Sequence, residues 1–126
     1  MIYTDEIINN PVKLSHYLIE NRVKNNIRAC DMTAGNGNDS KFILDKKNPK
    51  ILYAFDIQKL SQERCQKLIG QRENFKFILD DHKNIEKYIG EKIDLFIYNL
   101  GFLPRGDKSI TTNYKSVIKS LESALN

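Results

Sequence analysis

The sequence has few of the residues that mark secreted, metal-binding or membrane-spanning chains. It contains two cysteines, Cys30 and Cys65, which are too few for a disulfide framework, and no Cys/His cluster with metal-ligand spacing. No apolar run approaches the roughly 18 residues that cross a bilayer. Asp5 and Glu6 interrupt residues 1–10, so this segment lacks the apolar core of a secretion signal. We therefore expect a cytoplasmic protein with no metal site.

The length and composition are typical of one globular domain, which we assign to residues 1–126. Apolar residues make up 40% of the chain and charged residues 29%, an ordinary mix for a folded domain. The 20 basic residues outnumber the 16 acidic ones and give a formal charge of +4. This charge is compatible with a polyanion such as RNA but does not require one, because the basic residues are scattered along the chain.

Two hydrophobic periodicities alternate along the chain. The short apolar runs that predict strands occupy 27–31, 51–55, 75–79 and 93–98. The helical patterns occupy 11–23, a short stretch from 42 onward, 58–69, 85–89 and 114–125. This alternation predicts an α/β fold of the Rossmann-like type, with a parallel sheet and helices on both faces. Ligands of such sheets bind at the carboxyl ends of the strands.

The polar residues that stand out follow the predicted strands. Gly35 and Gly37 lie in the turn after the first strand, where they let the backbone turn tightly and approach a ligand closely. Asp56 closes the second strand about twenty residues later, the spacing at which an acid accepts hydrogen bonds from ribose hydroxyls. Asp80 closes the third strand, where it can meet the exocyclic amine of an adenine. These residues predict an adenosine site; the alternative is that the glycines make a turn and the acids cap loops.

The turn favours S-adenosyl-L-methionine over a dinucleotide. The dinucleotide motif G-x-G-x-x-G places a pyrophosphate on a helix N-terminus, but here Ser40 replaces the third glycine and Asp39 adds a negative charge beside it. Asp31 contributes another carboxylate, which suits the ammonium group of S-adenosyl-L-methionine. The predicted cofactor-binding residues are Asp31, Thr33, Gly35, Asn36, Gly37, Asn38, Asp39, Asp56, Ile57, Gln58, Asp80, Asp81, His82 and Asn99.

The segment after the fourth predicted strand suits methyl transfer to an amine. Such transfer is an in-line displacement, so the nitrogen lone pair must point at the methyl carbon within roughly 3–3.5 Å. The Asn99 side chain and the Leu100 carbonyl can accept the amine hydrogens, and Phe102 can supply a ring face for a base. We predict these three residues as catalytic; the alternative is that Asn99 and Gly101 form a plain strand exit.

Several segments also match the motifs of a known family: 15–16, 31–39, 54–58, 79–82, 99–104 and 106–112. On these segments the chain resembles the YtqB-like rRNA methylase family, which includes tRNA 5-aminomethyl-2-thiouridine methyltransferases of the MnmM type. The resemblance implies a class I methyltransferase fold, S-adenosyl-L-methionine as methyl donor, and methylation of the aminomethyl nitrogen on a modified wobble uridine in tRNA. It also gives weight to His16. It gives weight to Asp107 and Lys108 as well, whereas Arg105 stands where the family usually has Gly. The predicted substrate-binding residues are Phe102, Pro104, Arg105, Asp107 and Lys108, of which Arg105 and Lys108 are candidates for phosphate contacts.

The chain has fewer predicted strands than a complete sheet of this class. We therefore expect a C-terminally truncated domain that lacks the last strands. The fourth strand would then form an exposed edge, and this edge or the C-terminal helix would offer a surface for a homodimer. Three alternatives remain beside the tRNA methyltransferase: a catalytically impaired nucleotide-binding module that needs a partner chain, an rRNA methyltransferase, and an NAD-dependent oxidoreductase.

Overall fold

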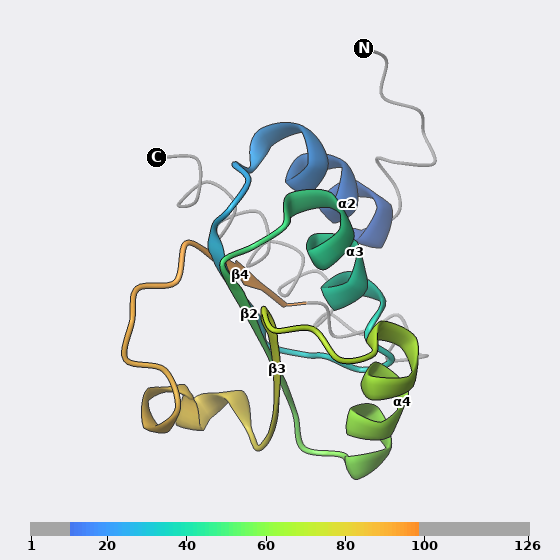
Figure 1. The fold of residues 1–126 in the computed structure, drawn as a ribbon, viewed down its shortest axis with the longest axis vertical. Helices are drawn as coiled ribbons and strands as arrows, with labels where there is room; N and C mark the ends of the chain where they lie inside the picture. Colours follow the sequence, from blue (N-terminus) through green and yellow to red (C-terminus); the bar gives the residue numbers. More distant parts are fainter. Residues whose placement is uncertain (1–10, 99–126) are drawn as a thin grey trace.

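The computed structural model describes residues 11–98, which form a layered α/β unit (Figure 1). Four strands alternate with three α-helices and one 3₁₀ helix. In chain order they are α2 (Pro11–Arg22), β1 (Arg28–Asp31), α3 (Asn38–Lys47), β2 (Ile51–Asp56), α4 (Lys59–Ile69), β3 (Phe75–Leu79), η1 (His82–Lys87) and β4 (Leu95–Ile97). None of these helices is long and apolar enough to cross a bilayer.

The four strands form one parallel sheet in the order β3-β2-β1-β4. At the carboxyl end of β1, Asp31 lies in register with Ala54 on one side and with Ile97 on the other. One strand further out, Asp56 lies in register with Leu79. The chain order reverses at β1, and this is the place where open α/β sheets bind ligands. The predicted α/β architecture is confirmed.

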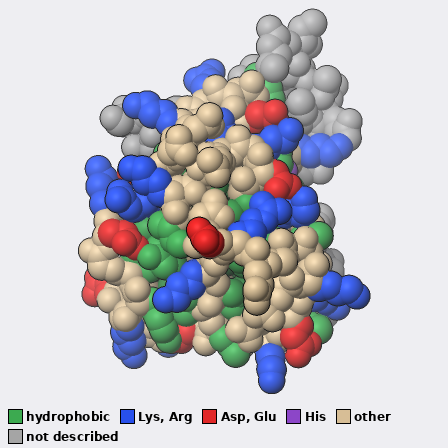
Figure 2. Space-filling view, in the orientation of Figure 1, with side chains coloured by type: hydrophobic (Ala, Val, Ile, Leu, Met, Phe, Trp, Pro, Cys, Tyr) green, Lys and Arg blue, Asp and Glu red, His purple; other side chains and the backbone are tan. Residues whose placement is uncertain are grey.

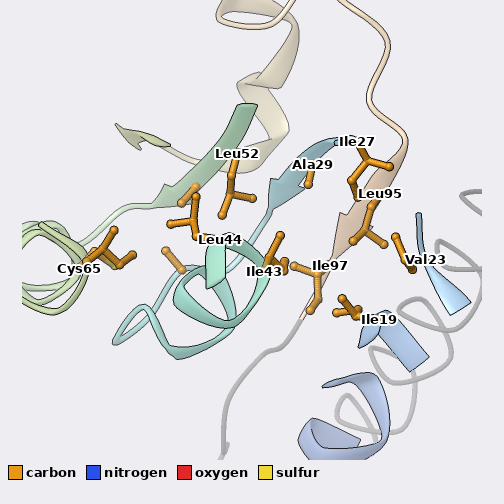
Figure 3. Close-up of a cluster of buried hydrophobic side chains, with 13 residues drawn as sticks. Ile19, Val23, Ile27, Ala29, Ile43, Leu44, Leu52, Cys65, Leu95 and Ile97 are labelled. Atoms are coloured by element: carbon orange, nitrogen blue, oxygen red, sulfur yellow. The ribbon is translucent and has the colours of Figure 1, made fainter. Parts of the chain in front are cut away.

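One face of the sheet is covered by α2, α3 and α4, which pack on it in a continuous apolar core (Figure 3). Alternate strand residues point into this core because successive side chains of a strand face opposite sides. Each fully buried Val, Leu or Ile side chain contributes roughly 1.5–3 kcal/mol. The strand residues in this core are Ala29, Leu52, Ala54, Leu95 and Ile97. The helices contribute Ile19, Ile43, Leu44, Cys65 and Ile69, and Val23 joins them directly after α2.

The other face has a second, smaller core covered by η1 and the segment that follows it. Cys30, Phe55 and Ile78 point to this side, and Ile85 and Ile89 pack against them. Helices therefore cover both faces, as predicted, although this one is a 3₁₀ helix. It begins at His82, earlier than the expected 85, because the Asp81 carboxylate caps it by accepting a hydrogen bond from the Lys83 N–H at 3.0 Å.

Two helices differ from the pattern read in the sequence. The apolar pattern of the opening helix predicts Leu14, Tyr17, Leu18 and Val23 on its buried side. In the structure Ser15 and Ile19 of α2 are buried, as is Val23 directly after the helix, whereas Leu14, Tyr17 and Leu18 are half-buried. Ser15 can be buried because its hydroxyl donates to the Val12 carbonyl at 2.8 Å. Helix α3 begins at Asn38 rather than at 42, and β4 is shorter than the predicted 93–98. The predicted helix 114–125 lies outside the described residues.

Candidate functional site

The loop between β1 and α3 turns through two glycines in left-handed conformations. Gly35 has φ +54° and Gly37, the N-cap of α3, has φ +89°. A Cβ atom on Gly37 would lie 3.0 Å from the Cys65 sulfur and 3.3 Å from the Cys65 Cα. Glycine is therefore required at position 37 for two reasons: its backbone conformation is left-handed, and α4 approaches it closely. Both glycines make the tight turn expected from the sequence, and their contact with a ligand stays a prediction.

Three side chains tie this loop to the neighbouring elements. The Gly35 N–H donates to Asp56 Oδ2 at 3.0 Å, and the Gly35 carbonyl accepts from the Ser61 hydroxyl at 2.5 Å. The Arg64 guanidinium donates to Asn36 Oδ1 at 2.8 Å. The other Asp56 oxygen accepts from the Gln58 N–H at 2.9 Å. Among residues 11–98 each Asp56 oxygen accepts one hydrogen bond and keeps a second acceptor position, so the carboxylate is oriented and able to accept from a ligand.

Asp31 lies at the end of β1 and is fully buried. One carboxyl oxygen accepts from the Thr33 N–H at 3.1 Å, and the other accepts from the Ser40 hydroxyl at 2.8 Å. Burial raises the pKa of Asp31 to about 7, the negative charge of Asp39 adds to this effect, and the two hydrogen bonds oppose it. A cation brought next to Asp31 would favour its ionised form and would itself be stabilised.

Asp39 lies in the first turn of α3 and is almost completely buried. Its Oδ1 lies 2.5 Å from His16 Nε2, and the His16 ring stacks on Phe42 with centroids 4.0 Å apart. These contacts attach α2 to the loop and bring His16 to the carboxyl edge of the sheet. Because Asp31 and Asp39 both carry carboxyl groups near the N-terminus of α3, this helix end does not suit a phosphate.

Asp80 follows β3 and is held by three donors. Its Oδ1 accepts from the Asp81 N–H at 2.6 Å and from the Asn84 amide at 3.0 Å, and its Oδ2 accepts from the Tyr88 hydroxyl at 2.5 Å. These bonds, led by that of Tyr88, lower the pKa of Asp80. Sequence reasoning missed Asn84 and Tyr88. The four-residue spacing of Asn84 from Asp80 would have indicated it if a helical turn had been expected from 82 onward, whereas no local spacing indicates Tyr88.

Two apolar side chains remain exposed beside these acids. Ile57 directly follows Asp56 and is 69% exposed, and Leu79 directly precedes Asp80 and is 44% exposed. Because Asp56 and Leu79 are register partners, all four residues lie at one edge of the sheet. Oriented carboxylates next to exposed apolar surface suit a ligand with a flat apolar ring and polar substituents.

The remaining predicted site residues divide into two groups. Asp81 caps η1, and the His82 ring meets Tyr98 edge-on with centroids 5.8 Å apart, so both lie after β3 near the same edge. The others lie outside the described residues: Asn99, Leu100, Phe102, Pro104, Arg105, Asp107 and Lys108.

One groove on the described residues lies away from this edge. This groove of about 510 Å³ is lined by the end of α4 and the start of β3, with Arg72, Phe75 and Phe77 among its residues, and it contains none of the predicted site residues. Figure 2 shows lysines and arginines spread over the visible face between other side chains. Within residues 11–98, no three His, Cys, Asp or Glu side chains gather to hold a metal ion.

Strand order, the glycine turn and the acids at the strand ends define a Rossmann-like α/β domain of the class I methyltransferase type. More particularly, the chain belongs to the family described as "Putative rRNA methylase", whose profile matches residues 52–126. The family membership expected from the sequence motifs is confirmed.

Individual relatives support the same assignment. A chloroplastic tRNA (mnm(5)s(2)U34)-methyltransferase of Arabidopsis thaliana is 28% identical over 89% of this chain, which spans 46% of that protein. A "putative methyltransferase" of Streptococcus mutans, solved in complex with SAH, is 34% identical with a TM-score of 0.67, and the match covers 100% of this chain and 69% of that one. A "putative rRNA-methylase" of Clostridium thermocellum is 30% identical with a TM-score of 0.69, covering 98% and 66%. The chain thus spans about half of the plant relative and about two thirds of these two structures.

Proposed function

We propose that this chain binds S-adenosyl-L-methionine at the carboxyl edge of its sheet and acts as the donor-binding part of an RNA methyltransferase. One observation carries the proposal. The glycine turn after β1 and the acids Asp31, Asp56 and Asp80 meet at one edge, each acid following a different strand of three adjacent ones. The family to which the chain belongs, and the SAH bound by the S. mutans relative, support the same cofactor.

Each acid along this edge suits a different part of the cofactor. The oriented Asp56 carboxylate suits the ribose hydroxyls, and the exposed Ile57 beside it suits one face of the adenine. Asp80 suits the adenine amine, and the buried Asp31 suits the ammonium group at the methionine end. A dinucleotide suits the same edge poorly, because its pyrophosphate would meet the carboxyl groups of Asp31 and Asp39.

The methyl-accepting side of the reaction falls to the segment after β4. Asn99, Leu100 and Phe102 follow the strand that lies beside β1 in the sheet. In our proposal the amide oxygen and the carbonyl orient the acceptor amine while the ring faces the base. The nitrogen lone pair forms the new bond to the methyl carbon, the carbon–sulfur bond breaks, and the amine loses a proton to solvent.

The finer proposal concerns the acceptor. We infer that it is the aminomethyl nitrogen of a modified wobble uridine in tRNA, which is the reaction in the name of the plant relative. The test is incubation of the full chain with labelled S-adenosyl-L-methionine and tRNA that carries the aminomethyl-thiouridine, followed by nucleoside analysis. We expect label in this nucleoside. Label in rRNA instead would contradict the tRNA assignment, and transfer to neither RNA would contradict the proposed activity.

A further inference from the structure

Tyr88 closes the segment after β3 onto Asp80. Its hydroxyl donates to Asp80 Oδ2 at 2.5 Å, and its ring meets Phe55 edge-on with centroids 6.0 Å apart. Tyr88 is the C-cap residue of η1, and its own N–H donates to the Ile85 carbonyl at 3.0 Å. The side chain is 43% exposed although both its ends are held. Backbone and ring contacts therefore fix a hydroxyl at the carboxyl edge of the sheet.

The hydrogen bonds around Asp80 leave a particular oxygen for a ligand. An ionised carboxylate has about four acceptor positions. Among the described residues, the donors to Oδ1 are the Asp81 N–H and the Asn84 amide, which fill that oxygen, whereas Oδ2 accepts from Tyr88. The remaining position is on Oδ2. The oxygen that would meet a ligand is thus the one that Tyr88 orients.

We propose that Tyr88 is a positioning residue that makes the site select a purine with a 6-amino group over one with a 6-keto group. This inference rests on the proposed cofactor site. Tyr88 donates to Asp80 and holds it as an acceptor, so Oδ2 can accept an N–H from an adenine amine. A keto oxygen at the same place would bring two acceptors together with no proton between them, which costs the hydrogen bond and leaves both groups unpaired.

The electrostatics of the pair agree with this role. The Tyr88 hydrogen bond is the largest of the effects that lower the pKa of Asp80, and the same bond raises the pKa of Tyr88. A protonated Asp80 would be a donor as well as an acceptor and would discriminate less between the two purines. Removing the Tyr88 hydroxyl would raise the pKa of Asp80, so the protonated carboxyl group would persist to higher pH.

The test uses the Tyr88→Phe variant of the full chain, which keeps the ring on Phe55 and removes the hydroxyl. S-Adenosylhomocysteine and S-inosylhomocysteine are titrated by calorimetry into wild type and variant. We expect wild type to prefer the adenosine compound. The variant should bind it about fivefold more weakly and bind the inosine compound almost as wild type does. As the solution is acidified, the variant should begin to lose affinity for the adenosine compound at a higher pH than wild type does.

Tyr53→Phe is the matched control. The Tyr53 hydroxyl donates to the Glu91 carboxylate, so this variant also loses a hydroxyl–carboxylate bond on the η1 face of the sheet, but in the middle of β2. We expect its ratio of the two affinities to equal that of wild type. A folded Tyr88→Phe variant whose ratio of the two affinities equals that of wild type, including an equal loss for both compounds, would overturn the inference alone. Failure of wild type to bind either compound would overturn the cofactor site itself.

Discussion

The two ends of the candidate site carry the same acid in opposite environments. Asp31, after β1, is fully buried, and burial raises its pKa to about 7. Asp80, after β3, lies near the surface among three donors, and its pKa is lowered. The buried end gains most from a cation, because a cation offsets the cost of ionising Asp31. The other end is ionised in advance and needs an N–H donor. A ligand with an ammonium group at one end and an amine on a ring at the other matches this difference.

Asp31→Asn should have the largest effect of the variants, because it removes the charge at the buried end of the site. The amide removes the negative charge while it stays close to the size of the carboxyl group. We expect affinity for S-adenosylhomocysteine to fall by about 3 kcal/mol, roughly 100-fold, because the ammonium group loses its buried partner. Calorimetric titration of the folded variant measures this. Wild-type affinity in the variant would show that the ammonium group lies elsewhere.

The ligand-free protein should become less stable as the pH rises, because of the same carboxyl. The pKa of Asp31 is about 7 in the folded state and about 4 in the unfolded chain. The folded state therefore binds more protons between these values, and its free energy of unfolding falls with pH across this window. We expect a loss on the order of 3–4 kcal/mol between pH 4 and pH 8 from this group.

Denaturant unfolding at several pH values measures this loss, with Asp31→Asn as the reference. The variant lacks the titrating group, so its stability should depend less on pH. Without ligand, its free energy of unfolding relative to that of wild type should rise toward the alkaline end of the window. The same slope in both proteins would contradict the assignment of the proton to Asp31.

Gly37→Ala tests how much the turn contributes to stability, apart from the acids that flank it. Alanine at position 37 would have to keep the left-handed backbone conformation, and its methyl group would approach the sulfur and Cα of Cys65. We expect a loss of about 2 kcal/mol in the free energy of unfolding, measured by denaturant titration. Gly90→Ala is the matched control, because a Cβ there meets nothing within 4 Å. Equal stability of the two variants would mean that the turn tolerates both the left-handed backbone of an alanine and the approach of its methyl group to α4.

His16→Gln should have the smallest effect and decide whether the site extends to α2. Glutamine can still donate to Asp39, but it loses the ring that stacks on Phe42. We expect the free energy of unfolding to fall by about 1 kcal/mol, with little change in affinity for S-adenosylhomocysteine. A tenfold loss of affinity at unchanged stability would instead assign His16 to the ligand.

The strands and the acids at their ends could be predicted from the sequence because they depend on local patterns. The run 75–79 matches β3, and Asp31, Asp56 and Asp80 lie at strand ends as expected. The start of α3 was missed because its N-cap, Gly37, makes no side-chain cap that a sequence could display. The complete burial of Asp31 and the bond between Tyr88 and Asp80 arise from packing between elements, on which periodicity has no bearing.

The central claim is that the carboxyl edge of the sheet is an adenosine site for S-adenosyl-L-methionine. Calorimetric titration of the full chain with S-adenosylhomocysteine tests it most directly, with NADH as the control ligand and Asp56→Ala as the control protein. The account predicts saturable binding of S-adenosylhomocysteine at one site, no binding of NADH, and an affinity about tenfold lower in Asp56→Ala. A folded wild-type protein that binds NADH, or that binds S-adenosylhomocysteine no better than Asp56→Ala does, would contradict it.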